Sequence, residues 1–156
     1  MAYPNDQKQT RKIETVEDLD IWQKSNALVI EIFKIVKSYP MHEWTGLSQK
    51  TKNLAVEIPI MIEKGFNKKH FREKMGLYIH SKELLDEVRY LLSVGDQLRY
   101  SKKIKDLYPK IDETTTMFMG LIRAMEKRNQ ANSMNPNQNP NQNQPRRNDP
   151  RQQQQQ

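Results

Sequence analysis

The sequence contains no cysteine, and this absence excludes several classes of functional site. A chain without thiols has no disulfide framework, no thiolate nucleophile and no cysteine-ligated zinc or iron–sulfur centre. Long apolar runs are missing as well. No window approaches the roughly 18 consecutive apolar residues of a membrane span, and "MAYPNDQKQTRK" at the start is followed by no apolar stretch typical of a signal peptide. We therefore expect a cytoplasmic protein that makes no membrane contact.

Hydrophobic residues make up only 35% of the 156 residues, and they are nearly absent from one end of the chain. Asn, Gln and Pro account for 19 of the 26 residues over 131–156. Ordering each residue there would cost about 1–2 kcal/mol, with almost nothing to bury in return. The composition predicts a flexible segment over 1–14, one folded domain over 15–130 and a disordered tail over 131–156. The tail's arginines allow contact with nucleic acid, but a solvating tail without a role is the simpler interpretation.

Apolar residues between 15 and 130 recur with the period of an α-helix, without the alternation typical of strands. The first predicted helix ends before Pro40. The second spans about 44–64 with Gly65 as its C′ residue, and the third spans about 68–94 and is closed by Gly95. The fourth carries the clearest heptad, which consists of Ile104, Ile111, Phe118 and Met125. Four amphipathic helices with short connections predict an all-α fold, an antiparallel up-down four-helix bundle.

Two prolines fall inside this helical pattern. Pro109 allows either a kinked fourth helix or a short turn followed by a helix that begins near Lys110. Pro59 lies in the middle of the second helix, where proline removes one backbone hydrogen bond and costs about 3 kcal/mol unless the helix bends. A bend would let the helix follow a curved core or open one turn for an intersubunit contact. A tolerated kink without functional meaning explains the sequence equally well.

No arrangement of residues in the sequence indicates catalysis. It has no glycine-rich phosphate loop, no G-x-S-x-G elbow, no H-E-x-x-H motif and no Glu-x-x-His element of di-iron bundles. His80, Glu83 and Glu87 share one helical face and could seat a metal, although a solvated face with a local His–Glu hydrogen bond is the simpler interpretation. We expect a protein without enzymatic activity, metal or cofactor.

Positive charge is concentrated in about a quarter of the chain. The formal net charge is +7, and the stretch 45–82 carries eight Lys and Arg against three Glu. A second basic group, made of Arg99, Lys102, Lys103 and Lys105, follows the third predicted helix and would lie at the other end of an up-down bundle.

Such a surface suits a polyanion such as RNA or DNA, because phosphates release counterions when they bind Lys and Arg. Lysine-rich helices that only keep a protein soluble are the competing interpretation. No motif for base-specific reading is present, so we expect recognition of backbone and shape. The predicted phosphate contacts are Lys50, Lys52, Lys64, Lys68, Lys69, Arg72 and Lys74.

Several segments resemble one known group of proteins. They are "LDIWQKS" at 19–25, "GLSQKTKNLAVEIP" at 46–59, "EKGF" around residue 65 and "HSKELLDEVRYLL" at 80–92. In order and spacing they resemble the four-helix-bundle superfamily of rRNA intervening-sequence proteins and Avd, the accessory variability protein of diversity-generating retroelements. The resemblance covers about residues 17–127. It implies a homopentameric barrel of bundles with a basic outer surface and no catalysis.

For the Avd branch, the resemblance also implies binding to nucleic acid and to a reverse transcriptase during mutagenic cDNA synthesis. Members of the superfamily usually have a proline at the place of Pro59. This chain departs from them in "EIPIMIEKG", where a pattern like "SIPSNIAEG" is common. Lys50 and Lys52 stand where arginines are frequent, which keeps the charge but loses the forked geometry that suits phosphate.

These observations lead to two hypotheses from different classes. The first is a non-enzymatic, homo-oligomeric nucleic-acid-binding accessory protein that assists a reverse transcriptase in a diversity-generating retroelement. The second is an rRNA intervening-sequence-type scaffold or protein-interaction module, which binds no nucleic acid and offers its exposed apolar stripes to a protein partner.

Overall fold

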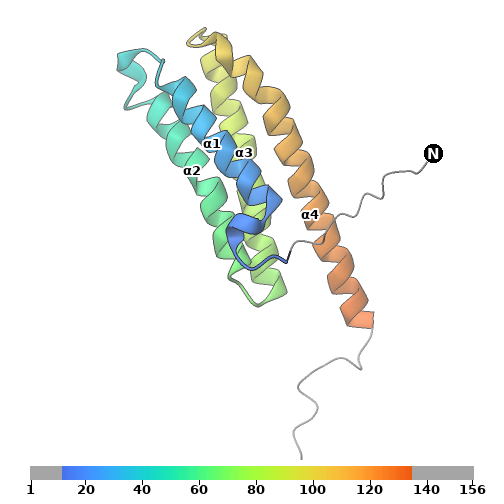
Figure 1. Ribbon diagram of the computed structural model, residues 1–156. Coiled ribbons are helices and arrows are strands. Elements are labelled where there is room, and N and C mark those ends of the chain that lie inside the picture. Colours follow the sequence, from blue (N-terminus) through green and yellow to red (C-terminus); the bar gives the residue numbers. More distant parts are fainter. Residues whose placement is uncertain (1–11, 135–156) are drawn as a thin grey trace, which may run out of the picture.

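The computed structural model describes residues 12–134 and is all-α, as predicted. Four long helices run alternately up and down, so that each is antiparallel to the next along the chain (Figure 1). Consecutive helices pack against each other, and α1 also contacts α4. The four helices are α1 (Asp20–Val36), α2 (Leu47–Phe66), α3 (Phe71–Gln97) and α4 (Tyr108–Met134). Short 3₁₀ helices precede α1, α2 and α4, and they are η1 (Val16–Asp18), η2 (Met41–Glu43) and η3 (Lys102–Leu107).

The last helix extends slightly beyond the predicted domain boundary. α4 continues to Met134, so residues 131–134 are helical and do not belong to the tail predicted over 131–156. The hydroxyl of Ser133 donates to the carbonyl of Asn129 at 2.9 Å. The two residues are four apart in the sequence, which is about one turn of an α-helix. The other predictions for the two ends concern residues 1–11 and 135–156, which lie outside the described residues.

The core lies along the axis of the bundle and receives side chains from every helix. Ile32, Ile58, Leu85 and Phe118 are fully buried, one from each of the four. Burying a side chain of this size contributes about 1.5–3 kcal/mol relative to leaving it in water. The periodic apolar positions of the sequence therefore supply the packing energy of the bundle.

Two glycines that were predicted to end helices lie inside them instead. Gly65 is buried within α2, where a Cβ would stand 3.4 Å from Leu77 Cβ and from the ring of Tyr78 on α3. Gly95 is buried within α3, and a Cβ there would overlap the hydroxyl of Tyr39. The prediction that these glycines follow the ends of their helices is wrong, because both lie inside a helix, and at Gly95 the close approach of Tyr39 requires glycine.

The two prolines are accommodated differently. Pro109 is the second residue of α4, where its missing N–H has no helical partner to lose. The fourth helix thus begins after a turn, which is one of the two predicted alternatives. Pro59 is buried in the interior of α2, which is helical on both sides of it. Its ring stands where an N–H would otherwise donate to the carbonyl of Ala55.

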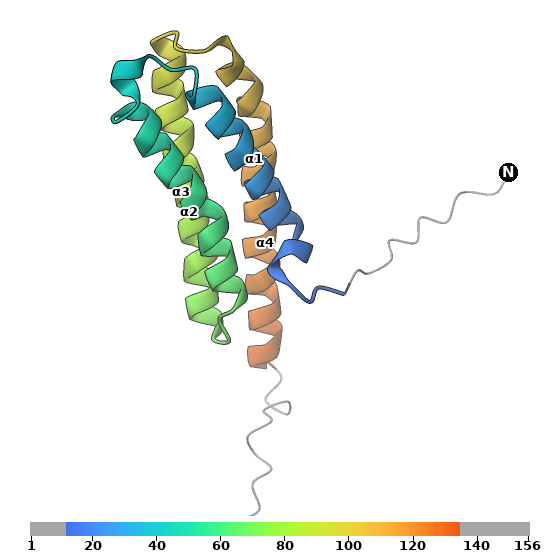
Figure 2. The same ribbon diagram turned by 60° about the vertical axis from the view of Figure 1, so that its left-hand side comes forward.

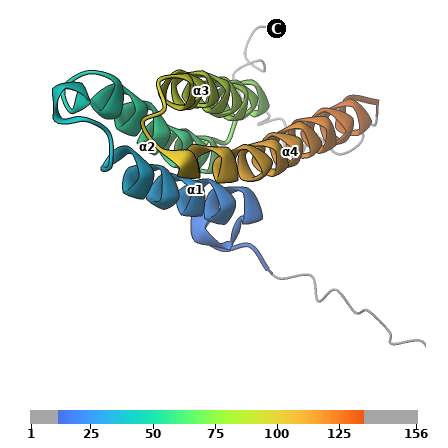
Figure 3. The same cartoon turned by 90° about the horizontal axis from the view of Figure 1, so that it is seen from above.

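α4 diverges from the other helices towards its C-terminal end (Figure 1, Figure 3). Its buried side chains, Ile111, Thr114 and Phe118, all belong to its first half. Leu121 and Met125 are only partly buried. Figure 2 shows the turn between α2 and α3 beside the C-terminal half of α4, and the divergence leaves a hollow between them.

Candidate nucleic-acid interface

The structure divides the seven predicted phosphate contacts between two places. Five of them lie at the α2–α3 turn or within one helical turn of it, and these are Lys64, Lys68, Lys69, Arg72 and Lys74. Lys50 and Lys52 lie near the start of α2, about 20 Å from Lys64 at the helical rise of about 1.5 Å per residue. The sequence interpretation therefore combined residues that belong to different ends of the bundle.

Lys50 and Lys52 also face different sides of α2. The ammonium of Lys52 lies 5.9 Å from the centre of the Phe33 ring on α1. Lys50 lines a hollow on the other side of the helix, together with Glu87 and Tyr90 of α3. Neither lysine lines the hollow beside the α2–α3 turn, so we do not include them in the candidate site.

Two of the five residues near the turn, Lys69 and Lys74, line a hollow of about 440 Å³, which we call the basic groove. It lies between the N-terminal segment, the α2–α3 turn and the C-terminal half of α4. Its cationic side chains are Lys69, Lys74 and Arg128. Apolar and amide side chains form the rest, namely Ile13, Leu19, Phe66, Phe71, Tyr78, Leu121, Met125, Asn129 and Asn132.

The cations of the basic groove are free to meet an anion. Within residues 12–134, Lys69, Lys74 and Arg128 have no carboxylate at ion-pair distance. Lys68, just outside the groove, lies 3.3 Å from Glu73, and both side chains are about half exposed. Such an exposed pair contributes only about 0–1 kcal/mol, so an incoming phosphate can displace it.

The floor of the groove adds apolar surface without adding charge. Phe66 and Phe71 are each partly exposed, on either side of the α2–α3 turn. Burial raises the pKa of the Tyr78 phenol, so this residue stays neutral below the groove. Tyr78 therefore adds no negative charge to oppose the cations of the groove.

Sequence reasoning missed Arg128. It lies far from the basic stretch in the chain, and only the antiparallel return of α4 brings it to the α2–α3 turn. The signal was nevertheless present, because Arg128 follows the heptad residue Met125 by three positions and therefore faces the same side of the helix. Lys64 and Arg72 are exposed at this end of the bundle but do not line the groove.

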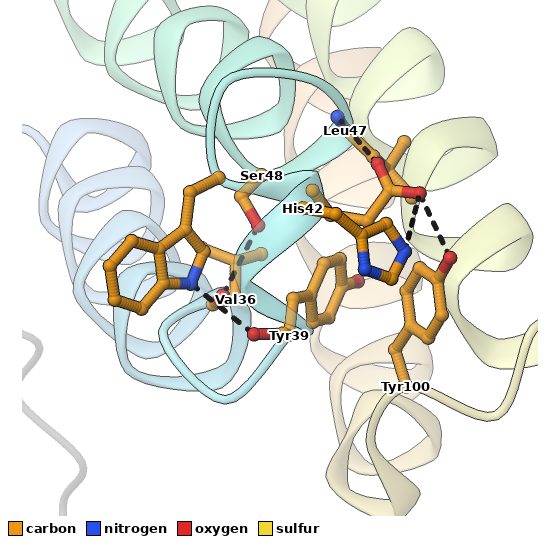
Figure 4. A network of polar contacts seen from close by, with 8 residues as sticks. Val36, Tyr39, His42, Leu47, Ser48 and Tyr100 are labelled. Carbon is orange, nitrogen blue, oxygen red and sulfur yellow. Dashed lines mark hydrogen bonds and ion pairs between the residues drawn. The ribbon is translucent and has the colours of Figure 1, made fainter.

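A polar network links the chain connections at the end of the bundle opposite the basic groove (Figure 4). The Glu43 carboxylate accepts hydrogen bonds from the Tyr100 hydroxyl at 2.9 Å and from the Leu47 N–H at 3.2 Å. These two bonds lower the pKa of Glu43. The nearby Tyr39 hydroxyl is buried, and burial raises its pKa to about 12. The network joins η2 to the connection after α3 and contains none of the predicted site residues.

The alternative metal site gains no support from the geometry. His80 Nδ1 lies 3.6 Å from Glu83 Oε2, while Glu87 borders the hollow beside Lys50. Across residues 12–134, no group of three or more His, Asp and Glu side chains is arranged to hold a metal ion. In the same part of the chain, no helix combines the length and the apolarity that crossing a bilayer requires.

Comparison with known proteins identifies one family. A family model described as 23S rRNA-intervening sequence protein matches residues 17–120, which include α1, α2, α3 and the first half of α4. Comparison with curated proteins finds no match. Because the family match covers well over half of the chain and most of the bundle, the chain belongs to the 23S rRNA-intervening sequence protein family.

Proposed function

We propose that this protein is a non-catalytic nucleic-acid-binding protein that holds the phosphate backbone in the basic groove. The observation that carries the proposal is the convergence of Lys69 and Lys74, beside the α2–α3 turn, with Arg128 of α4 on one hollow. Phe66 and Phe71 lie in the same hollow. Cations beside exposed aromatic rings are typical of single-strand binding, because phosphates meet the cations while unpaired bases stack on the rings.

Binding of this kind depends chiefly on charge. Each phosphate contact on a single strand contributes a slope of about −0.7 to the dependence of log affinity on log salt concentration. Three groove cations correspond to a slope of about −2 from the groove alone. Arg128 offers a planar fork that can hold one phosphate through two hydrogen bonds, whereas the two lysines act as mobile point charges.

We further propose that the protein acts as a homo-oligomer, with five copies as the superfamily resemblance implies. Support comes from large apolar side chains that the isolated bundle leaves exposed on one side. Ile30, Phe33 and Trp44 are 39–51% exposed, and Phe33 and Trp44 border an apolar hollow of about 330 Å³. Several grooves on one oligomer would strengthen binding to a long strand, because each later contact is intramolecular.

A finer version of the proposal assigns the bound strand to a reverse transcriptase. In this version the protein is an accessory of the Avd type during mutagenic cDNA synthesis. Its support is the sequence resemblance alone, since the matching family is named for rRNA intervening sequences. A reverse-transcriptase gene with paired template and variable repeats beside this gene would be the corresponding genomic observation.

The second candidate function is a scaffold or protein-interaction module that binds no nucleic acid. The hollow beside Phe33 and Trp44 favours it, because its walls are almost entirely apolar and suit a protein side chain better than a phosphate. The family match supports this candidate better than the reverse-transcriptase role.

Binding of the purified protein to labelled single-stranded RNA and DNA over a salt series separates the two candidates. The nucleic-acid proposal expects an affinity that falls log-linearly with salt, with a slope near −2 or steeper. Light scattering on the same sample gives the mass of the binding species. If neither strand binds at low salt, the nucleic-acid proposal fails and the scaffold function takes its place.

A further inference from the structure

A second cationic hollow lies at the other end of the bundle, where the chain passes from α3 to η3. It has a volume of about 680 Å³, within the range of small-molecule sites. Its lining consists of Asp96, Gln97, Arg99, Ser101, Lys102 and Lys105, and we call it the Arg99 hollow. None of these residues lies in the basic groove.

Charge in the Arg99 hollow is strongly unbalanced. In the described part of the chain, Arg99, Lys102 and Lys105 have no carboxylate at ion-pair distance. Asp96 is the one acid in the lining, and its carboxylate already accepts a hydrogen bond from the Tyr108 hydroxyl at 3.4 Å. Three cations and one carboxylate therefore line the hollow, so positive charge is in excess there.

The local backbone directs two of these cations to the same side. Lys102 and Lys105 are three residues apart in η3, and side chains at this spacing lie one above the other in a 3₁₀ helix. Lys103 is equally exposed but does not line the hollow. The neighbouring Ser101 oxygen accepts a hydrogen bond from the Lys103 N–H at 3.3 Å, which leaves the serine proton available to a ligand.

Arg99, the third cation, occupies a position where glycine is the usual residue. Tyr100 N–H donates to the Gly95 carbonyl and Arg99 N–H to the Asp96 carbonyl, both at 2.9 Å, which is the Schellman arrangement at the end of a helix. Arg99 is its C′ residue, with a left-handed backbone at φ 59°. A side chain in this conformation costs about 1 kcal/mol relative to glycine. The chain therefore carries a cationic side chain beside the hollow at a position where glycine would be less strained.

We propose that the Arg99 hollow is a binding site for a multiply charged phosphate group, such as a terminal phosphate of a nucleic-acid strand or the phosphates of a free nucleotide. The guanidinium of Arg99 offers a bidentate fork, Lys102 and Lys105 add point charges, and Gln97 and Ser101 supply neutral donors. The site does not depend on the basic groove, because the two lie at opposite ends of the bundle.

Titration of the full chain with inorganic pyrophosphate, followed by calorimetry and amide NMR shifts, tests the proposal. We expect Lys102→Gln with Lys105→Gln to weaken pyrophosphate binding about tenfold or more, since each lost contact involves a charged hydrogen bond. Lys103→Gln with Lys34→Gln is the matched control, because it also removes two positive charges, both from exposed positions outside the hollow and one of them from η3. Equal losses in the control and the double variant, or no loss in either, would overturn the proposal.

Arg99→Gly provides a second test, because a residue with a purely structural role would not change pyrophosphate binding. We expect this variant to unfold at a higher temperature, because glycine relieves the left-handed backbone, and at the same time to bind pyrophosphate more weakly. A variant that is more stable and binds equally well would contradict the site.

The source of the phosphate is distinguished with RNA oligonucleotides that carry either a 5′-phosphate or a 5′-hydroxyl. The protein for this experiment carries Lys69→Gln, Lys74→Gln and Arg128→Gln, so that the basic groove does not contribute. A preference for the phosphorylated oligonucleotide supports a strand terminus as the ligand. Equal binding of the two oligonucleotides together with retained pyrophosphate binding supports a free phosphate compound. If pyrophosphate shifts none of the Arg99, Lys102 and Lys105 amides, the site does not exist, whatever the groove binds.

Discussion

Tyr39, in the connection after α1, packs against Gly95 of α3 and against Tyr100 in the connection after α3. The Tyr39 ring is buried against Gly95 of α3 and lies 5.3 Å from the ring of Tyr100, measured between centres. Its hydroxyl is buried without a hydrogen-bond partner among the described residues, so packing and not polarity fixes its place. A contact of this kind tolerates no added atom.

Substitution of Gly95 tests this contact. A Cβ would overlap the Tyr39 hydroxyl, so we expect Gly95→Ala to lower the free energy of unfolding by about 1–3 kcal/mol, the usual cost of overpacking. Chemical denaturation at neutral pH measures it.

Gly76 and Gly120 are matched controls, since both lie in helices and a Cβ at either position meets no atom within 4 Å. Gly76→Ala and Gly120→Ala should instead raise the free energy of unfolding by about 0.5–1 kcal/mol through helix propensity. Destabilisation of similar size at all three positions would contradict a specific contact at Gly95.

Glu43 gives the fold a dependence on pH. The hydrogen bond from Tyr100 is the main cause of its lowered pKa, so the ionised carboxylate is favoured in the folded state. A lowered folded-state pKa stabilises the fold above the ordinary value of 4.5, and that stabilisation is lost as pH falls through the folded-state pKa. We expect thermal unfolding temperatures to fall on acidification more steeply in the wild type than in Tyr100→Phe. Parallel curves for the two proteins would show that this hydrogen bond is not responsible.

At the scale of the element, α4 combines a firmly packed half with a loosely packed one. Its buried side chains end at Phe118, and beyond this point the helix diverges from its neighbours (Figure 3). Backbone hydrogen bonds with few buried contacts around them open at lower free energy. We therefore expect amides over 124–134 to exchange with deuterium sooner than those over 111–118, as measured by hydrogen exchange with mass spectrometry. Uniform protection along α4 would contradict this division.

The helices themselves were predictable from the sequence, whereas their ends were not. Buried positions such as Ile111 and Phe118 recur at helical spacing, so the pattern reveals which segments are helical and which face is buried. Helix ends were misjudged because glycine serves two purposes. Gly65 and Gly95 permit close packing inside helices, while Arg99 adopts the left-handed conformation that glycine usually supplies. Only the tertiary neighbours distinguish these cases.

The candidate site was predictable in part for a related reason. The concentration of lysines around residues 64–74 is a local feature, and it lies at the end of the bundle where the structure has the basic groove. The groove itself depends on how α4 diverges and on where its last turns return, which no local pattern reveals. For the same reason Lys50 and Lys52 were grouped with residues that lie elsewhere.

For the whole molecule, the proposed oligomer should depend on the apolar side of α1 and the start of α2. We expect Phe33→Asp with Trp44→Asp to reduce the mass measured by light scattering towards that of one chain, because a charge there costs several kcal/mol once buried in an interface. Tyr90→Asp is the control, since Tyr90 is 66% exposed and borders a different hollow. An unchanged mass in the double variant would place the subunit contact elsewhere.

Binding of RNA by two charge-matched variants shows whether the basic groove holds the phosphate backbone. The groove variant combines Lys69→Gln, Lys74→Gln and Arg128→Gln, and its control combines Lys34→Gln, Lys103→Gln and Lys127→Gln, which remove the same charge from exposed positions outside the groove. Affinity for a labelled single-stranded RNA is measured for both at several salt concentrations. The account predicts that the groove variant binds more weakly at every salt concentration and that its slope is shallower by about 2, while the control stays close to the wild type. Equal losses of affinity and slope in the two variants would contradict the groove and leave only general electrostatic attraction.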